Sequence, residues 1–278
     1  MARNPLTLLR AVKRRLSPPP PEPEPPEEPD EPRGPLHRLH SIDMDILGLS
    51  RGERILDVGC GTGRHVVEAA RSKCFFVGVD FNRGELQTLR AIIYHQSIEG
   101  KMRGRGSPVQ ADGAVLPFKD AVFDRVMATE VFEHVPDEHM MMRELARVLR
   151  PGGTIAVSVP DIRSEVIVWG VALSHRQRPG EHVRIFRHQQ MVDLLQENGL
   201  RVYTRRYRQS MESLFWILAL TSKKGTIRRK TAVALRRFLD RHTNANSRRL
   251  NQVENIGNYI IPKSAVFYAR KPARGGSR

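Results

Sequence analysis

The sequence has few cysteines and no long apolar run. Its two cysteines, Cys60 and Cys74, form no Cys-x-x-Cys pair and no zinc-ligand spacing, which argues against a disulfide framework and against a metal site. No stretch reaches the roughly 18 to 20 apolar residues that cross a bilayer, and the N-terminus lacks the apolar core of a secretory signal. These absences predict a cytoplasmic protein without a metal cofactor, with peripheral association at a membrane as the alternative localisation.

The charge of the chain is strongly basic and unevenly placed. The 278 residues carry a net charge of +16, and residues 201–278 hold 19 Lys and Arg against 3 Asp and Glu. The first 200 residues therefore balance to zero. A basic C-terminal region suits an anionic partner, either a membrane surface or the phosphates of a nucleic acid.

The most informative segment is an apolar strand that runs into a glycine-rich turn, Ile55-Leu56-Asp57-Val58-Gly59-Cys60-Gly61-Thr62-Gly63. Glycines at every second position let the backbone bend and approach a ligand without Cβ clashes, and a following helix offers unpaired N–H groups. The spacing is Gly-x-Gly-x-Gly rather than the Gly-x-Gly-x-x-Gly of a dinucleotide site. The acid ahead of the glycines, Asp57, suits a cofactor that carries an ammonium group.

Strands and helices alternate along the chain. This alternation predicts a parallel sheet with helices on both faces and a ligand site at the carboxyl ends of the strands. The apolar runs predict strands at residues 54–58, 75–79, around 109, 125–129, 154–159, 200–207 and 265–269. The helical patterns and stop signals predict helices at residues 43–47, 64–72, 84–98 and 136–151, and a further helix that stops at Gly199.

Five segments together resemble the class I S-adenosylmethionine-dependent methyltransferases, and the nearest branch is the type 11 group of small-molecule and lipid methyltransferases. They follow the order and spacing of that family between about residues 40 and 208. The resemblance implies a Rossmann-like, doubly wound α/β sheet of seven strands, mostly parallel with an antiparallel last strand, and S-adenosylmethionine as the cofactor. The segments are residues 55–66, 75–80, 110–118, 123–134 and 149–154.

The resemblance also implies which residues bind the cofactor. Asp80 would accept hydrogen bonds from the ribose hydroxyls, and Asp112 would lie beside the adenine. A helix N-cap and an ordinary Asp-Gly turn are the other roles that these two positions allow. The full set of predicted cofactor-binding residues is Asp57, Gly59, Cys60, Gly61, Gly63, Asp80, Phe81, Asp112, Gly113 and Glu130.

Methyl transfer from a sulfonium is an in-line displacement, so the protein mainly aligns the nucleophile with the methyl carbon. A base is needed only where the nucleophile carries a proton. The predicted catalytic residues are His134 and Glu130, which follow the strand ending at Thr129, and His134 comes first because an imidazole titrates near neutral pH. The same Glu-His pair also fits the lead-in to a helix.

Composition divides the chain into three parts. Residues 1–17 are predicted to form a basic amphipathic arm. Residues 18–35 are predicted to form a disordered linker rich in Pro and Glu, because residues 18–32 hold nine prolines and six acids. Residues 36–278 form the predicted methyltransferase domain, in which residues 208–262 are a helical insertion between the sixth and seventh strands.

The predicted insertion combines an apolar run at residues 214–220 with a series of Lys and Arg. The run fits a lid or a membrane-surface element, and a buried helix that caps the pocket is the alternative. The predicted function is therefore S-adenosylmethionine-dependent methyl transfer to a small, hydrophobic or lipid-linked acceptor, with an anionic membrane surface as a partner. The alternative is an RNA methyltransferase whose basic region contacts phosphates, although no Asn/Asp-Pro-Pro-Tyr-type signature follows the fourth strand.

Overall fold

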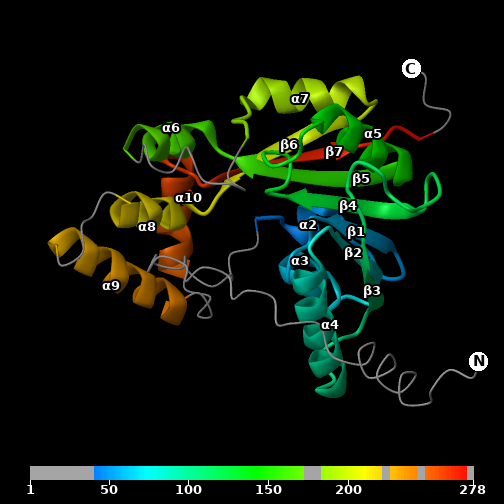
Figure 1. The fold of residues 1–278 in the computed structure, drawn as a ribbon, viewed down its shortest axis with the longest axis horizontal. Coiled ribbons are helices and arrows are strands. Elements are labelled where there is room, and N and C mark those ends of the chain that lie inside the picture. Colours follow the sequence, from blue (N-terminus) through cyan, green and yellow to red (C-terminus); the bar gives the residue numbers. More distant parts are fainter. Residues whose placement is uncertain (1–40, 172–182, 221–225, 243–247, 274–278) are drawn as a thin grey trace, which may run out of the picture. The chain divides into compact units, whose positions relative to one another are not determined.

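The computed structural model describes residues 41–171, 183–220, 226–242 and 248–273 (Figure 1). The predicted arm at residues 1–17 and the predicted linker at residues 18–35 lie outside the described residues. Seven strands form a single sheet. They are β1 (Arg54–Val58), β2 (Phe75–Asp80), β3 (Arg105–Gln110), β4 (Phe123–Thr129), β5 (Leu149–Pro160), β6 (Arg201–Arg208) and β7 (Ser264–Arg270).

The strands lie in the order β3-β2-β1-β4-β5-β7-β6. Neighbouring strands are parallel except that β7 runs antiparallel to both β5 and β6. The predicted fold class, a doubly wound seven-stranded sheet with an antiparallel last strand, is confirmed. The strand order reverses between β1 and β4, and in sheets of this kind ligands bind at the carboxyl ends of the strands beside that reversal.

The centre of the sheet is apolar on both faces. In β1, Ile55 is 1% exposed and belongs to one core, whereas Leu56 is fully buried in the other core. Leu56 lies opposite Val126 of β4, which is also fully buried. Continuous apolar strands are typical of parallel sheets that helices cover on both faces. This burial fixes the register of the central strands and with it the place of the loops that follow them.

In the described part of the chain, six helices accompany the strands up to β6. The best-marked of them is α5, in which Met141, Met142, Leu145 and Val148 are all fully buried on one face. Helix α7 is followed by Gly199 in the left-handed conformation (φ 74°), as its stop signal predicts. The six are α2 (Met44–Leu47), α3 (Arg64–Ala69), α4 (Arg83–Ile98), α5 (Glu138–Val148), α6 (Ile162–Val171) and α7 (His188–Glu197).

The boundary between α5 and β5 differs from the prediction. The predicted helix runs to Pro151, whereas α5 ends at Val148 and β5 begins at Leu149. Leu149 has an extended backbone and pairs with Phe123 of β4, so strand pairing starts before the Pro-Gly-Gly turn. A second difference is α6, which follows directly after β5 and was not predicted.

Among the described residues between β6 and β7, three helices are present, namely α8 (Ser210–Leu220), α9 (Ile227–His242) and α10 (Arg248–Ile260). Figure 1 shows α6, α8 and α10 gathered beyond the carboxyl end of β5. The apolar run at residues 214–220 lies in α8 and turns Phe215 and Ala219 inward against Ala232 of α9. This packing favours the buried-helix alternative for that run. In the described part of the chain, no helix is long and apolar enough to cross a membrane.

Candidate cofactor and acceptor site

The three glycines after β1 have different structural roles. Gly59, Gly61 and Gly63 all have positive φ angles, of 70°, 51° and 85°. A Cβ at Gly59 would lie 2.2 Å from a methyl carbon of Val131, and one at Gly63 would lie 2.2 Å from a methyl carbon of Leu89. A Cβ at Gly61 would lie 3.8 Å from Glu85 Oε2, which is an ordinary contact distance. Gly59 and Gly63 therefore permit close packing, whereas the positive φ of Gly61 is what favours a glycine there.

Asp80 joins the glycine loop to the loop after β2. Its Oδ2 accepts a hydrogen bond from the Gly61 amide at 2.8 Å, and its Oδ1 accepts one from the Asn82 amide at 2.8 Å. Asn82, rather than Asp80, caps α4, because its Oδ1 accepts from the Gly84 amide at 2.8 Å. Asn82 therefore fills the helix N-cap role that was the alternative for Asp80. The Asp80 carboxylate is held in place with lone pairs left over for a ligand.

The neighbouring loops complete the same edge of the sheet. The ring of Phe81 is 82% exposed, and the carbonyl of this residue accepts a hydrogen bond from the Gln110 side chain at 3.1 Å. Asp112 forms a turn in which its Oδ1 accepts from the Ala114 amide at 2.8 Å. A Cβ at Gly113 would lie 2.9 Å from a methyl carbon of Val58, so a side chain there would push this turn away from β1.

Asp57 is a buried carboxyl at the point where β1 meets the glycine loop. The residue is 2% exposed, and its Oδ1 has no hydrogen-bond partner. Burial, with a smaller contribution from the negative charge of Asp80, raises the pKa of Asp57 to about 7, while Arg64 opposes the shift. An orphaned buried carboxyl oxygen is costly unless a donor meets it. The ammonium group of S-adenosylmethionine is a donor of the right charge, so the residues present fit this cofactor.

Cys60 lies in the glycine loop, and its thiol is buried and unreactive. The residue is 7% exposed, its amide donates to the Val79 carbonyl at 3.0 Å, and its thiol donates to the Gly61 carbonyl at 3.6 Å. Burial raises the pKa of the thiol, which keeps the proton on the sulfur. Any contact of Cys60 with a ligand would therefore come from its backbone.

The loop after β4 begins with a strained residue. Glu130 has a φ of 54°, which non-glycine residues rarely adopt. Its amide donates to the Ser158 carbonyl at 3.0 Å, and its Oε1 accepts from the Ser158 hydroxyl at 2.8 Å. These two bonds to β5 hold the strained backbone and orient the carboxylate.

Two adjacent residues further along this loop, Glu133 and His134, differ sharply in burial. Glu133 is 1% exposed, and neither of its carboxyl oxygens has a hydrogen-bond partner. Burial, together with the negative charges of Glu130 and Glu165, raises the pKa of Glu133 well above its usual range, against the opposing effects of its own backbone amide and of Lys263. The side chain of His134 is 41% exposed, and its Nε2 lies 4.0 Å from Glu133 Oε1. The sequence pattern pointed first to His134, and it contained no signal that Glu133 is the buried member of the pair.

The structure therefore brings the predicted residues together only in part. The predicted cofactor residues lie in or directly after β1, β2, β3 and β4, at the carboxyl edge of the sheet. His134 follows β4 as well, but its side chain is 41% exposed. Among the described residues, no group of three His, Cys, Asp or Glu side chains is placed to hold a metal ion.

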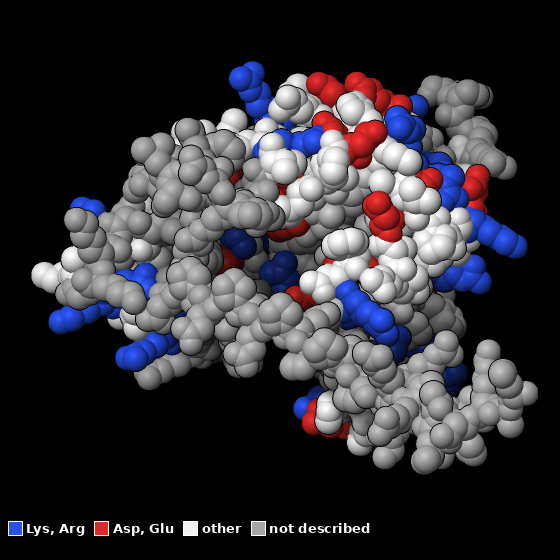
Figure 2. All heavy atoms as spheres, in the orientation of Figure 1, with Lys and Arg blue, Asp and Glu red and all other residues white. Residues whose placement is uncertain are grey.

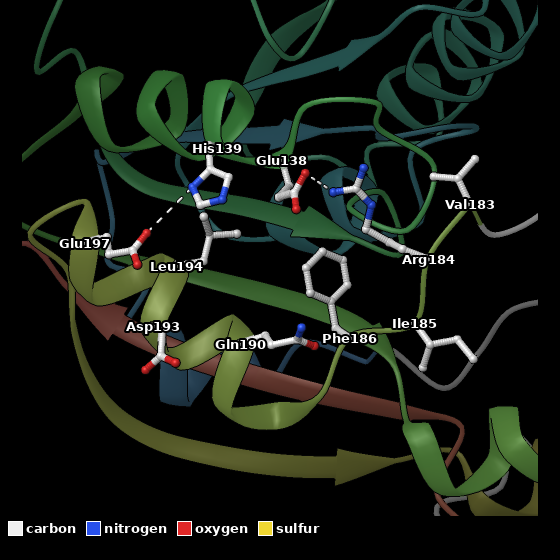
Figure 3. A pocket seen from close by; sticks show the side chains of 10 residues that line it. All are labelled: Glu138, His139, Val183, Arg184, Ile185, Phe186, Gln190, Asp193, Leu194 and Glu197. Carbon is white, nitrogen blue, oxygen red and sulfur yellow. Dashed lines mark ion pairs between the residues drawn. The ribbon is translucent and has the colours of Figure 1, made fainter.

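A separate pocket of about 590 Å³ lies between the start of α5, residues 183–186 and α7 (Figure 3). Its charged groups pair with one another across the pocket. Arg184 forms an ion pair with Glu138, and His139 Nδ1 lies 3.6 Å from Glu197 Oε2. The pocket residues are Glu138, His139, Val183, Arg184, Ile185, Phe186, Gln190, Asp193, Leu194 and Glu197, and they include no predicted cofactor or catalytic residue.

The strand order, the antiparallel β7 and the glycine loop after β1 are together those of the class I S-adenosylmethionine-dependent methyltransferases. More narrowly, residues 56–157 match the family described as "Methyltransferase domain", the type 11 group. S-adenosylmethionine is the methyl donor of this class, as the sequence predicted.

Individual relatives match parts of the chain. Methyltransferase GfsG of Streptomyces halstedii is 35% identical over 144 residues, which cover 49% of this chain and 50% of that protein. Demethylmenaquinone methyltransferase of Corynebacterium glutamicum is 37% identical over 112 residues, or 40% of this chain and 44% of that protein. The chain spans about half the length of the curated relatives that it matches. A solved methyltransferase from Methanosarcina mazei shares the fold, with a TM-score of 0.56 and 17% identity over 81% of this chain and 95% of that one.

Proposed function

We propose that this protein transfers a methyl group from S-adenosylmethionine to a small, hydrophobic or lipid-linked acceptor. The observation that carries the proposal is the carboxyl edge of the sheet, where a buried carboxyl with an unpartnered oxygen, a glycine turn and a fixed second carboxylate lie on adjacent loops. The cofactor supplies an electrophilic methyl group on a good leaving group. The protein's contribution is then to bind, orient and exclude water.

In this proposal Asp57 binds the ammonium group of the cofactor and Asp80 binds the ribose hydroxyls. The backbone of Gly61 lies next to the methionine portion, while Gly59 and Gly63 permit the packing that shapes the loop. The exposed ring of Phe81 and the turn at Asp112 flank the adenine. Cys60, Gly113 and Glu130 complete the set, Cys60 through its backbone.

Glu133 is the favoured base for an acceptor that carries a proton. It is buried and without a hydrogen-bond partner, and its pKa is raised by burial. A base with a raised pKa holds a proton more strongly, which suits abstraction from a hydroxyl, thiol or ammonium group. Glu130 and His134 remain candidates, with Glu130 held by Ser158 and His134 closer to solvent.

The acceptor class is inferred from two features. Demethylmenaquinone methyltransferase, a relative over part of the chain, is named for a hydrophobic quinone. Helices α6, α8 and α10 lie beyond the carboxyl end of β5, where they can cover an acceptor (Figure 1). The RNA alternative rests on the basic C-terminal region, which includes the cations of α9. An activity assay with excess RNA as a competitor separates the two proposed functions, because a small-molecule enzyme keeps its activity in the presence of that RNA.

Calorimetry of S-adenosylmethionine binding tests the core of the proposal. Asp80→Ala should weaken binding by roughly 10- to 100-fold, because hydrogen bonds to a charged group contribute about 1.5–3 kcal/mol. Asp193→Ala on α7 is the matched control, since it removes an exposed carboxylate away from the cofactor loops and should leave binding unchanged. Absence of binding by the wild-type protein, or equal binding by Asp80→Ala, would reject this cofactor site. Mass spectrometry of quinone and isoprenoid acceptors incubated with the cofactor then tests the transfer.

A further inference from the structure

Helix α10 packs through its polar face. Asn258 is 5% exposed, and its Oδ1 accepts a hydrogen bond from the Ser210 amide at the start of α8, at 2.9 Å. The Ser210 hydroxyl donates to the Glu254 carbonyl at 3.1 Å. Gly257 lies between these positions, and a Cβ there would come within 2.4 Å of the Ser210 hydroxyl oxygen. The inner face of α10 is thus made of polar and small residues.

The outer face of the same helix is apolar and exposed. We call these four residues the α10 stripe: Val253 is 57% exposed, Ile256 66%, Tyr259 76% and Ile260 64%. Their spacing places them on one side of the helix, opposite Glu254, Gly257 and Asn258. An amphipathic helix of a soluble domain normally turns its apolar side toward the core. In α10 this arrangement is reversed, so the apolar side is left for a partner outside the domain.

The surroundings of the α10 stripe are strongly basic. Residues 208–262 contain eleven Lys and Arg against three Asp and Glu. On α9, Arg228, Lys230 and Arg237 are exposed, and Figure 2 shows Lys and Arg side chains along this helix. Both α9 and α10 pack against α8, so the cations and the stripe belong to one group of helices. Apolar side chains combined with cations are the pattern of helices that lie in the headgroup region of anionic membranes.

We propose that the α10 stripe, together with the cations of α9, docks the protein on the surface of an anionic lipid bilayer. A second copy of the chain fits this face less well, because two copies joined there would bring two basic insertions together. A stable dimer also needs about 1,200 Å² or more of buried surface, which four side chains on one helix do not provide. The docking surface deepens the proposed function and rests on it only for the acceptor, which would reach the site from the bilayer.

This assignment moves the membrane contact away from the segment that the sequence indicated. The apolar run of α8 buries Phe215 and Ala219 against α9, so those side chains are not available to lipid. In the proposal α8 connects the two docking helices to the domain, and α10 provides the apolar contact.

Co-flotation of the full chain with vesicles tests the proposal. The wild-type protein should float with phosphatidylcholine vesicles that contain phosphatidylglycerol, and high salt should reduce the bound fraction. The variant Ile256→Ser/Ile260→Ser should lower the partition coefficient by about tenfold or more, from the loss of two inserted side chains. Arg228→Gln/Lys230→Gln/Arg237→Gln should lower it by roughly fivefold per charge. Ile98→Ser on α4 is the matched control, because Ile98 is also 66% exposed, and it should bind as the wild type does.

Three outcomes would overturn the proposal. In the first, the stripe variant binds vesicles as well as the wild type does. In the second, the wild type binds pure phosphatidylcholine vesicles as well as it binds those with phosphatidylglycerol. In the third, the wild type forms a concentration-dependent dimer that is lost in the stripe variant. Calorimetry of S-adenosylmethionine on the same preparations separates the two proposals. A stripe variant that binds the cofactor but not vesicles supports docking, whereas a wild type that binds vesicles but no cofactor rejects the proposed function alone.

Discussion

The carboxyl edge of the sheet and the outer face of α10 depart from the usual pattern of burial in opposite ways, since the first buries carboxyl groups and the second exposes apolar ones. At the sheet edge, Asp57 and Glu133 are buried carboxyls with oxygens that lack hydrogen-bond partners. On α10, Ile256 and Ile260 are apolar side chains that remain exposed. Each arrangement costs stability in the isolated chain, and each is relieved by a different kind of partner. A compact polar ligand satisfies the first, and an extended apolar surface satisfies the second.

The largest expected effect concerns Glu133 as a base. Glu133→Gln should lower the turnover of a protonated acceptor by roughly 10²- to 10⁴-fold, the usual range for a general base. Because burial raises the pKa of Glu133, the wild-type rate should rise with pH over a higher range than an ordinary glutamate would give, and Glu133→Gln should abolish this rise. The measurement is kcat/KM as a function of pH, with S-adenosylmethionine affinity as the check on folding.

His134→Ala is the control for that experiment. If His134 is the base, the rise with pH should persist in Glu133→Gln and disappear in His134→Ala. Loss of cofactor affinity in Glu133→Gln would show a structural effect instead of a catalytic one.

The next effect concerns the stability of the protein without its cofactor. A carboxyl with a pKa of about 7 when folded and about 4 when unfolded binds its proton more tightly in the folded state. The contribution of Asp57 to folding stability is therefore greatest below pH 4, and it falls by about 4 kcal/mol as the pH rises from 4 to 7. Asp57→Asn should remove this dependence while it weakens cofactor binding. Urea unfolding at several pH values measures it, and an unchanged slope in the variant would contradict the assignment.

A smaller effect distinguishes the two faces of α10. Asn258→Ala should cost about 1–3 kcal/mol, because it leaves the buried amide of Ser210 without an acceptor. Asn255→Ala, at an exposed position of the same helix, should change stability by less than about 0.5 kcal/mol. Urea midpoints compare the two, and equal values would mean that the polar face does not hold α10 to α8.

The smallest effect is expected on the α10 stripe itself. Ile256→Ala should change the free energy of unfolding by no more than about 0.5 kcal/mol in the absence of lipid. The reference is Leu145→Ala in α5, where the side chain is fully buried and the expected loss is about 2–5 kcal/mol. A loss at Ile256 comparable to that at Leu145 would show that the stripe is already covered within the protein.

Helices α5 and α10 also show how far the sequence could predict the structure. Both have an apolar and a polar side, and for α5 the rule that apolar residues face the core holds at Met141 and Leu145. For α10 the rule fails, because the hydrogen bond from Ser210 to Asn258 and the close approach at Gly257 hold the polar side inward. A periodic pattern shows that a helix has two sides, but the contacts of the neighbouring helix decide which side is buried.

The candidate site likewise contains residues that the sequence could predict and residues that it could not. The glycine loop and Asp80 could be predicted because a sharp turn after a buried strand restricts the residue types within a few positions. Glu133 could not be selected over His134, since adjacent residues point in directions that depend on how the loop after β4 is bonded to β5. The Glu130 backbone, fixed by Ser158, contributes to that choice and lies 28 positions away from its partner in sequence.

The position of β7 has a consequence for the order in which the molecule can be built. β7 separates β5 from β6 and follows both in the chain, so during synthesis the edge of β5 and the facing edge of β6 stay open until residues 264–270 emerge. Helices α8 to α10 are made in that interval. Open strand edges are sites of mispairing between chains, so the interval is the period in which a nascent chain most needs protection. The length of the insertion therefore determines how long the incomplete sheet exists during synthesis before β7 is available to pair with β5 and β6.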